Sequence, residues 1–236
     1  MTKENGKRAD LNKNPDEVAA MFDGVARRYD IANDILSLGR TRAWRKKVKN
    51  LISPTTGMQI LDLAAGTGSS SEPLAKAGAS VTALDFSEGM LAAGRKRRPY
   101  INFVLGDALA LPFEKNSFDI TTISFGLRNT NNFDKALSEA LRVTKLGGRL
   151  FIVEFSEPTF KPFRYIYMEY LMRALPWIAK RATSNPEAYI YLAESIRAWP
   201  NQRDLARRVV AAGWSDVHFK NMTGGVVAVH IGTKAR

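Results

Sequence analysis

Apolar and polar positions along the chain follow a repeating order of strand-like and helix-like segments. Short runs rich in β-branched residues predict strands at 58–64, 79–85, 101–107, 118–125 and 148–155. The segments between them predict helices that begin at Ser71 and Ser87 and a helix over 133–144. The strand runs are almost continuously apolar, which is typical of a parallel sheet covered by helices on both faces. Such sheets bind their ligands at the carboxyl ends of the strands.

Both ends of the chain depart from this alternation. Residues 15–28 and 41–52 predict two helices before the first strand, and 214–220 with 226–234 predict an antiparallel hairpin around "MTGG". We therefore expect an α/β, doubly wound, Rossmann-like fold in a single domain over 15–236, after a disordered tail at 1–14. Within that domain we expect an N-terminal helical cap at 15–56 and a helical insertion or lid at 161–200.

The stretch "QILDLAAGTGSSS" predicts a strand that runs into a nucleotide-binding turn. Gly66 and Gly68 supply the first two glycines of a dinucleotide fingerprint, but Ser71 stands at the third position. Asp85 ends the second strand 19 residues after Gly66, where a ribose-binding acid is expected. Because the ribose acid is kept while the pyrophosphate fingerprint is broken, we predict a nucleoside without phosphates. S-adenosylmethionine, with S-adenosylhomocysteine as its product, fits this pattern.

The third strand ends in a further carboxylate. Asp107 would accept a hydrogen bond from the adenine amino group, and the Ala108 amide would serve the adenine ring. Three strand ends in register therefore make up the predicted nucleoside site.

Four segments, "YDIANDILSLGRTRAW", "ISFGLRN", "GGRLFIVEFS" and "AYIYLAESIRAWP", resemble one known family. Over residues 15–236 the chain is similar to the C-methyltransferases of menaquinone and ubiquinone biosynthesis, which are class I S-adenosylmethionine-dependent enzymes. The resemblance implies a seven-stranded sheet whose final hairpin is antiparallel. The cofactor contacts that it implies are Thr67, Asp85, Asp107 with Ala108, and Ser124 at the end of the fourth strand.

The resemblance also implies an acceptor. This is the ring of a prenylated quinol, with demethylmenaquinol converted to menaquinol, and a benzoquinol of the ubiquinone pathway is the alternative. The chain departs from the family at Ala32, Thr41 and Ser69, where Met, His and Asp are usual, and at Thr144 and Leu146, where an aliphatic residue and Pro are usual.

A quinol ring carbon becomes nucleophilic when a phenolic proton is lost, so the protein must stabilise an oxyanion and provide a route for the proton. Arg128 in "FGLRN" is our predicted oxyanion partner, because its guanidinium stays protonated. Tyr29, Asp30 and Asn129 are candidates for orienting the ring or relaying its proton. His230 is a candidate base, although a lone strand histidine is more often a hydrogen-bonded core residue. The spacing of His, Asp and Glu predicts no metal site.

Composition narrows the rival functions. The absence of cysteine excludes disulfides, thiolate metal sites and cysteine nucleophiles, including the covalent route of pyrimidine C5 methylation. The net charge of +12 favours anionic partners, but no Asn-Pro-Pro-aromatic run of amino-methylating enzymes follows the fourth strand, and we expect no nucleic acid. A nicotinamide oxidoreductase is disfavoured by Ser71, and a non-enzymatic cofactor-binding scaffold is the third rival.

The most apolar segment is "FKPFRYIYMEYLMRALPWIAKRA", which Pro162 bounds and Pro176 is expected to break. One interpretation is a lid over an isoprenoid groove that makes peripheral contact with an anionic membrane. The other is that its apolar face covers the sheet or forms a homodimer. We expect a cytoplasmic protein, with the inner face of the cell membrane as the site of any such contact.

Overall fold

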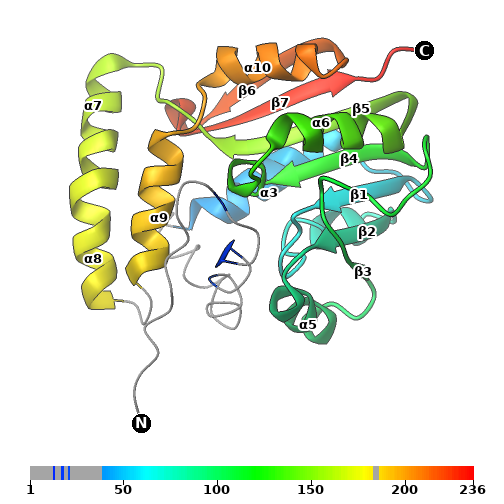
Figure 1. The fold of residues 1–236 in the computed structure, drawn as a ribbon, viewed down its shortest axis with the longest axis horizontal. Helices are drawn as coiled ribbons and strands as arrows, with labels where there is room; N and C mark the ends of the chain where they lie inside the picture. Colours follow the sequence, from blue (N-terminus) through cyan, green and yellow to red (C-terminus); the bar gives the residue numbers. More distant parts are fainter. Residues whose placement is uncertain (1–12, 14–16, 19–20, 22–38, 183–185) are drawn as a thin grey trace.

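A computed structural model describes residues 13, 17–18, 21, 39–182 and 186–236. Seven strands form one mixed sheet in the order β3-β2-β1-β4-β5-β7-β6 (Figure 1). The first five strands are parallel to one another, β7 pairs antiparallel with β5, and β6 pairs antiparallel with β7. The expected parallel sheet with an antiparallel C-terminal hairpin is confirmed. The strands are β1 (Gln59–Leu63), β2 (Ser80–Asp85), β3 (Asn102–Leu105), β4 (Phe118–Ser124), β5 (Thr144–Phe155), β6 (Ser215–Met222) and β7 (Val227–Thr233).

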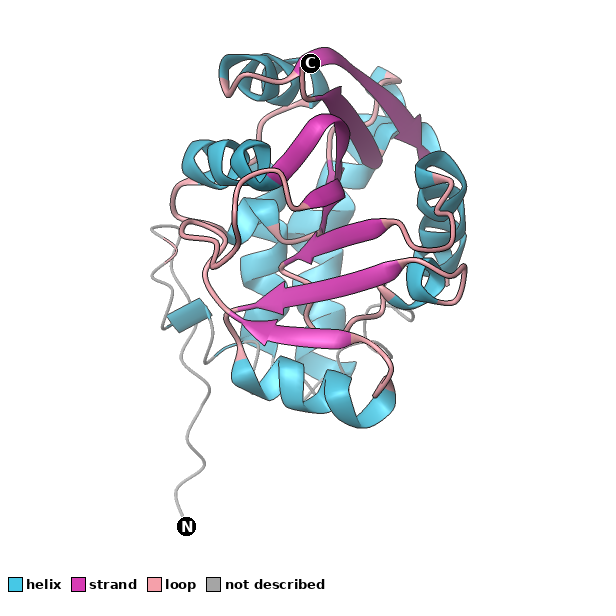
Figure 2. Cartoon of the chain, turned by 90° about the vertical axis from the view of Figure 1, so that its right-hand side faces the viewer, coloured by secondary structure: helices cyan, strands magenta, loops and turns pink. Residues whose placement is uncertain are grey.

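Helices cover both faces of the sheet, which lies as one twisted layer between them (Figure 2). One apolar core joins one face of β1, β4 and β5 to α6 and α10, and a second joins the other face to α3. The helices are α3 (Arg40–Ile52), α4 (Glu72–Ala75), α5 (Glu88–Arg97), α6 (Phe133–Val143), α7 (Lys161–Glu169), α8 (Leu175–Ala182), α9 (Pro186–Arg197) and α10 (Gln202–Ala211). The described residues also form three short helical turns, η1 (Leu127–Asn129), η2 (Tyr170–Ala174) and η3 (Thr223–Gly225).

Two elements differ from expectation in extent. The helix after the glycine turn has only four residues and ends in a turn through Gly78, whose φ is 94°, before β2 begins. The hydroxyl of Ser71, its N-cap residue, bonds to Asp62 and makes no capping bond. Strand β5 begins at Thr144, four residues before the expected start at Gly148, because Thr144 pairs with Phe118 ahead of a bulge in the β4–β5 ladder. The helix expected at 15–28 falls mostly outside the described residues.

Helices α7 and α8 form one column at the edge of the molecule, with α9 packed beside it, and the column stands beyond the carboxyl ends of the parallel strands (Figure 1). We expected Pro176 to break this column, and that expectation is wrong. The π-helical turn η2 widens the helix just before Pro176, so that the amide of Leu175 donates to the carbonyl of Tyr170 and the chain continues into α8.

Candidate functional site

A cavity of about 320 Å³ lies at the carboxyl ends of β1, β2, β4 and β5. Helix α3 forms one side of it, and α7, η2, α8 and α9 contribute residues to the other. The strand ends supply Ala64–Thr67 after β1, Asp85 and Phe86 at β2, Ser124–Gly126 at β4 and Phe155 at β5. The position agrees with the ligand edge expected of a doubly wound sheet.

The glycine turn and Asp85 are bonded to each other at this edge. The Gly66 amide donates to Oδ2 of Asp85 at 2.7 Å, and the Ser87 amide donates to Oδ1 at 2.9 Å. Gly66 and Gly68 have φ of 57° and 78°, and a Cβ on Gly68 would lie 2.7 Å from the ring of Phe103. The carboxylate of Asp85 is thus held in place at the cavity wall, where it can accept ribose hydroxyls.

Beneath the turn lies a buried carboxylate whose partner is Ser71. The Ser71 hydroxyl donates to Oδ2 of Asp62 at 2.6 Å, and Oδ1 of Asp62 has no partner among the described residues. Burial raises the pKa of Asp62 to about 7. Ser71, which breaks the dinucleotide fingerprint, therefore has a structural task that a third glycine could not perform.

Two residues at the cavity edge have an unusual backbone conformation. Ala64 and Phe125, which follow β1 and β4, have φ of 50° and 59°, in the left-handed region that non-glycine residues rarely adopt. A Cβ on Gly126 would lie 2.3 Å from the Cβ of Ala64, so the two strand ends approach as closely as a glycine permits. Strain of this kind is often found where backbone must meet a ligand.

The structure does not gather every residue of the predicted nucleoside site. Thr67 and Ser124 border the cavity together with Gly66 and Asp85, whereas Gly68 does not. Asp107 is exposed, its Oδ1 accepts from the Leu109 amide at 2.9 Å, and neither it nor the buried Ala108 borders the cavity. Their contact with the adenine stays a prediction.

Arg128 and Asn129, from η1, border the other end of the cavity. Nη1 of Arg128 donates to the Phe125 carbonyl at 2.6 Å and to Glu154 at 2.7 Å and 3.2 Å, while Nη2 makes no hydrogen bond within the described part of the chain. Burial raises the pKa of Glu154, and the charge of Arg128 opposes that rise. Asn129 accepts from the hydroxyl of Tyr191 at 3.3 Å. Nε of Arg128 is buried and also without a partner within the described residues, so part of the guanidinium stays available to a ligand.

Aromatic rings surround this end of the cavity. The rings of Trp44, Phe125 and Phe155 lie 5.0 to 6.4 Å apart, and the guanidinium of Arg128 lies 5.2 Å from the ring centre of Phe155. The helical column and α9 add further apolar and aromatic side chains: Phe163, Tyr167, Tyr170, Leu171, Leu175, Tyr189, Tyr191, Leu192 and Ile196. This end suits a flat, apolar ring that carries an oxygen.

The remaining candidates lie elsewhere. His230 on β7 is buried and does not border the cavity. Its Nε2 donates to the Gln202 carbonyl at 2.8 Å, and burial lowers its pKa to about 4. It is a neutral core histidine. His218 is exposed on β6. Tyr29 and Asp30 lie outside the described residues. Over 39–182 and 186–236 no cluster of His, Asp and Glu could hold a metal ion.

Sequence reasoning missed several residues of this wall. Glu154 carries a usable signal, because it is the one acid in the apolar run "FIVEF" and a buried acid needs a partner. Trp44 carries another, because it lies on the apolar face of α3 with Val48 and Ile52. Tyr167 and Tyr191 carry no such signal, because a helical pattern does not show whether an apolar face lines a cavity or packs in a core.

Residues 9–234 match the model of the ubiE/COQ5 methyltransferase family. A protein of Renibacterium salmoninarum named demethylmenaquinone methyltransferase is 62% identical over 223 residues, or 94% of each chain. One of Streptomyces avermitilis with the same name is 58% identical over 97% of this chain and 99% of its own. Phosphoethanolamine N-methyltransferase 2 of Haemonchus contortus, solved with S-adenosyl-L-methionine, shares the fold with a TM-score of 0.60 at 16% identity, over 82% of this chain and 53% of its own.

Proposed function

We propose that this chain, which belongs to the ubiE/COQ5 methyltransferase family, transfers the methyl group of S-adenosylmethionine to a ring carbon of demethylmenaquinol. One observation carries the proposal. A single cavity joins the glycine turn and Asp85 at one end to Arg128 and an aromatic wall at the other. A polar nucleoside and an apolar quinol could therefore meet in it. The names of the relatives supply the identity of the acceptor.

The cofactor end fits S-adenosylmethionine through its donor set. Asp85 would accept from the ribose hydroxyls, Thr67 and Ser124 offer hydroxyl groups, and the turn at Gly66 lets the backbone approach the methionine part. S-adenosylmethionine, when bound, supplies a methyl group already activated by its sulfonium. The protein must then bring the acceptor carbon into line with that methyl group and keep water out.

At the acceptor end we place the quinol ring against Trp44, Phe125 and Phe155. Nη2 of Arg128 faces the ring oxygen and stabilises the oxyanion that forms when the phenolic proton leaves. Asn129, oriented by Tyr191, holds the second oxygen. The ring carbon then takes the methyl group, the bond from sulfur to that methyl group breaks, and the ring regains aromaticity by releasing its own proton.

A direct test uses purified protein, methyl-labelled S-adenosylmethionine and reduced demethylmenaquinone, beside a matched benzoquinol that lacks the ring methyl group. We expect label in menaquinol. Label in the benzoquinol alone would assign the ubiquinone pathway, and label in neither, with intact cofactor binding, would favour a cofactor-binding scaffold. Turnover should fall in Arg128→Met paired with Glu154→Gln, a double variant that leaves no unpaired buried charge, while cofactor binding persists.

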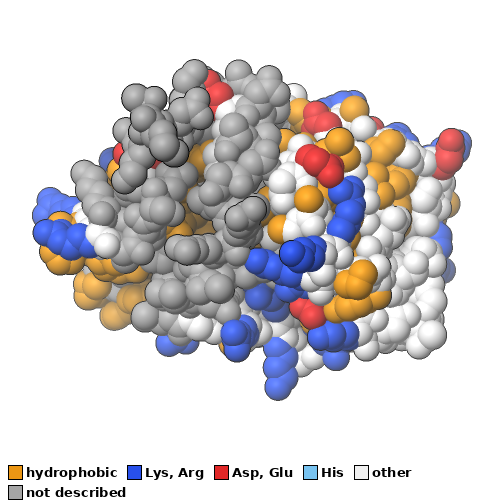
Figure 3. Space-filling model, turned by 90° about the horizontal axis from the view of Figure 1, so that it is seen from below, with side chains coloured by type: hydrophobic (Ala, Val, Ile, Leu, Met, Phe, Trp, Pro, Cys, Tyr) orange, Lys and Arg blue, Asp and Glu red, His pale blue; other side chains and the backbone are white. Residues whose placement is uncertain are grey.

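We propose that residues 15–236 form a single domain and that its helices at 161–200 are a lid over the acceptor's isoprenoid tail. Several of the large apolar side chains that are exposed over the described ranges belong to α7, to α8 or to the residue just before α7. They are Phe160, Phe163, Tyr165, Ile166 and Trp177. Arg181 stacks on Trp177 at 3.9 Å. From below, hydrophobic side chains gather with Lys and Arg at this end of the molecule (Figure 3). No helix of the described residues is both long and apolar enough to cross a bilayer.

We propose that this outer face of α7 and α8 makes peripheral contact with an anionic membrane at the inner face of the cell membrane, where a prenylated quinol resides. The segment 160–182 carries five Lys and Arg residues against one Glu, which matches anionic headgroups. Exposed Trp and Phe beside cations are typical of interfacial helices. Pairing of this face in a homodimer is the alternative, and the vesicle experiment below separates the two.

A further inference from the structure

The contacts proposed above leave the charged groups at the amino-acid end of the cofactor without a named partner. S-adenosylmethionine carries an α-carboxylate, and an anion that leaves water needs a cation or several hydrogen-bond donors in return. Asp85 serves the ribose, and the glycine turn serves the chain that leads to the sulfonium. The inference below therefore rests on the proposed cofactor and concerns only its amino-acid end.

Four charged side chains border the cavity among the described residues, and two of them are already engaged. Asp85 accepts from two backbone amides, and Arg128 pairs with Glu154. The other two, Arg40 and Arg45 on α3, form no side-chain hydrogen bond or ion pair within the described part of the chain. Within 39–182 and 186–236, the cavity wall therefore offers two positive charges that no acidic side chain pairs with.

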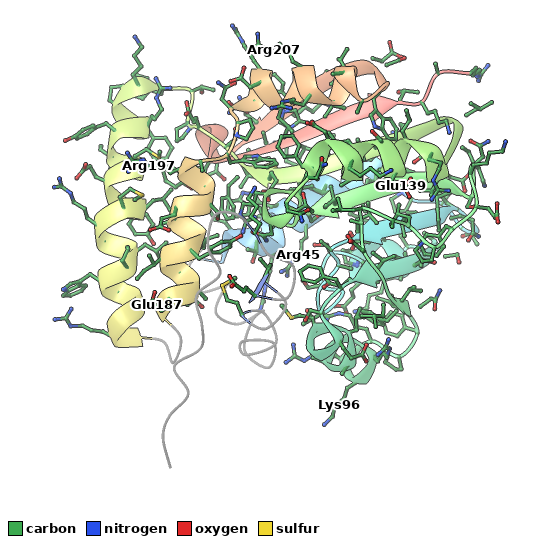
Figure 4. All side chains as sticks on the ribbon, viewed as in Figure 1. Arg45, Lys96, Glu139, Glu187, Arg197 and Arg207 are labelled. Atoms are coloured by element: carbon green, nitrogen blue, oxygen red, sulfur yellow. The ribbon has the colours of Figure 1, made fainter. Side chains whose placement is uncertain are left out.

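Arg45 borders the cavity between the glycine turn and the aromatic wall, because the small pocket that it also lines includes both Ser70 and Phe125. Arg40, in contrast, borders the main cavity alone. Trp44, the preceding residue, is buried and donates from Nε1 to the Thr223 hydroxyl at 2.9 Å, which fixes the rotation of α3 about its axis. Arg45 is labelled in Figure 4, near the middle of the molecule.

Among the described residues, no acid near the turn pairs with this guanidinium. Helix α3 contains no Asp or Glu, and the turn continues with Ser69 and Ser70, both of which border the cavity. Glu72, the first acid after the turn, is engaged by Arg98 and Lys76. A planar guanidinium with a free fork of donors matches a carboxylate in shape as well as in charge.

We infer that Arg45 binds the α-carboxylate of S-adenosylmethionine. It positions the amino-acid end while Asp85 holds the ribose, so that the cofactor is fixed at both ends and its methyl group points along the cavity. Arg45 thereby distinguishes cofactors that carry an amino acid from adenosine thioethers that lack one.

Calorimetric binding tests this without any turnover, with two probes that share adenosine and a thioether. S-adenosylhomocysteine has the carboxylate, and 5′-deoxy-5′-methylthioadenosine does not. Arg45→Gln should weaken binding of S-adenosylhomocysteine by about ten- to a hundredfold, the range of charge-assisted hydrogen bonds. Binding of methylthioadenosine should stay unchanged. Arg45→Lys keeps the charge but loses the fork of donors, so its affinity for S-adenosylhomocysteine should lie between those of the wild-type protein and Arg45→Gln.

Lys47→Gln is the matched control, because it removes the same charge from an exposed position of α3 that does not border the cavity. It should leave both affinities unchanged. Unchanged binding of S-adenosylhomocysteine to Arg45→Gln would overturn the inference while leaving the proposed function intact, and so would an equal loss for both probes. Failure of the wild-type protein to bind S-adenosylhomocysteine would overturn the proposed function itself.

Discussion

Arg128 and Glu154 form an ion pair beneath the cavity, with Nη1 of Arg128 at 2.7 Å from Oε1 of Glu154 and side chains that are only 5% and 1% exposed. The pair joins the residue that we place on the quinol oxygen to the middle strands of the sheet. Two opposite charges this deeply buried depend on each other, because neither can be rehydrated when its partner is lost.

Glu154→Gln should therefore lower the free energy of unfolding by about 3 to 5 kcal/mol, because it leaves the guanidinium charged and unpaired in a low-dielectric site. Urea denaturation followed by circular dichroism measures this loss. The double variant Arg128→Met with Glu154→Gln should recover most of it. If the double variant were as unstable as the single one, lost packing rather than lost charge pairing would be the cause.

Asp85→Ala should weaken binding of S-adenosylhomocysteine and methylthioadenosine alike, because both carry the ribose that Asp85 is proposed to hold. Two charge-assisted hydrogen bonds correspond to a loss of about a hundredfold or more. Asp107→Ala tests the predicted adenine contact separately, since Asp107 is exposed and does not border the cavity in this structure. An equal loss in Asp107→Ala would mean that the strand end after β3 closes over the adenine when the cofactor binds.

Asp62 should make stability depend on pH. Its pKa is raised from 3.8 to about 7 in the folded protein, so the folded state holds a proton that the unfolded state has lost over this interval. The stabilising contribution is present at low pH and is lost as pH rises from about 4 to about 7, with a slope of at most about 1.4 kcal/mol per pH unit. Asp62→Asn should remove this slope in urea denaturation, and a wild-type curve parallel to that of the variant would refute it.

Gly126→Ala should destabilise the protein by about 1 to 3 kcal/mol, the usual cost of overpacking, because the new Cβ meets that of Ala64. Ala64→Gly should rescue it, since it removes the opposing methyl group and relieves a φ of 50°. The melting temperatures of the four proteins of this cycle measure the coupling. Additive effects would show that the two strand ends do not constrain each other.

Sedimentation with phosphatidylglycerol vesicles tests the outer face of α7 and α8. Replacing Ile166 and Trp177 by Ser should reduce the bound fraction several-fold, and added salt should reduce it further, because the proposed contact combines apolar insertion with charge. Val210→Ser is the control, since Val210 is a similarly exposed apolar residue on α10. Equal binding by all three proteins would exclude this face as the membrane contact. A dimer that dissociates only in the double variant would assign the face to a subunit interface.

Local patterns sufficed for the sheet and for part of the site. Apolar runs predicted the strands, and the spacing of Gly66 and Asp85 predicted two residues that the structure places together at the cavity edge, although not the hydrogen bond between them. Pairings between distant residues were out of reach, because a pattern along the chain does not show which side chains meet. The bond from Ser71 to Asp62 depends on how the turn folds back on β1, and Arg45 looks like any other cation in "WRKKVK" until α3 is placed beside the turn.

The wide turn at Tyr170–Ala174 holds one more residue than an α-helix would need there. Deleting a residue from this turn should restore ordinary helical spacing and leave α8 in phase with α7, whereas the same deletion within α8 would rotate everything after it by about 100°. Loss of one residue at this turn should therefore disturb the packing of the column less than loss of a residue within α8.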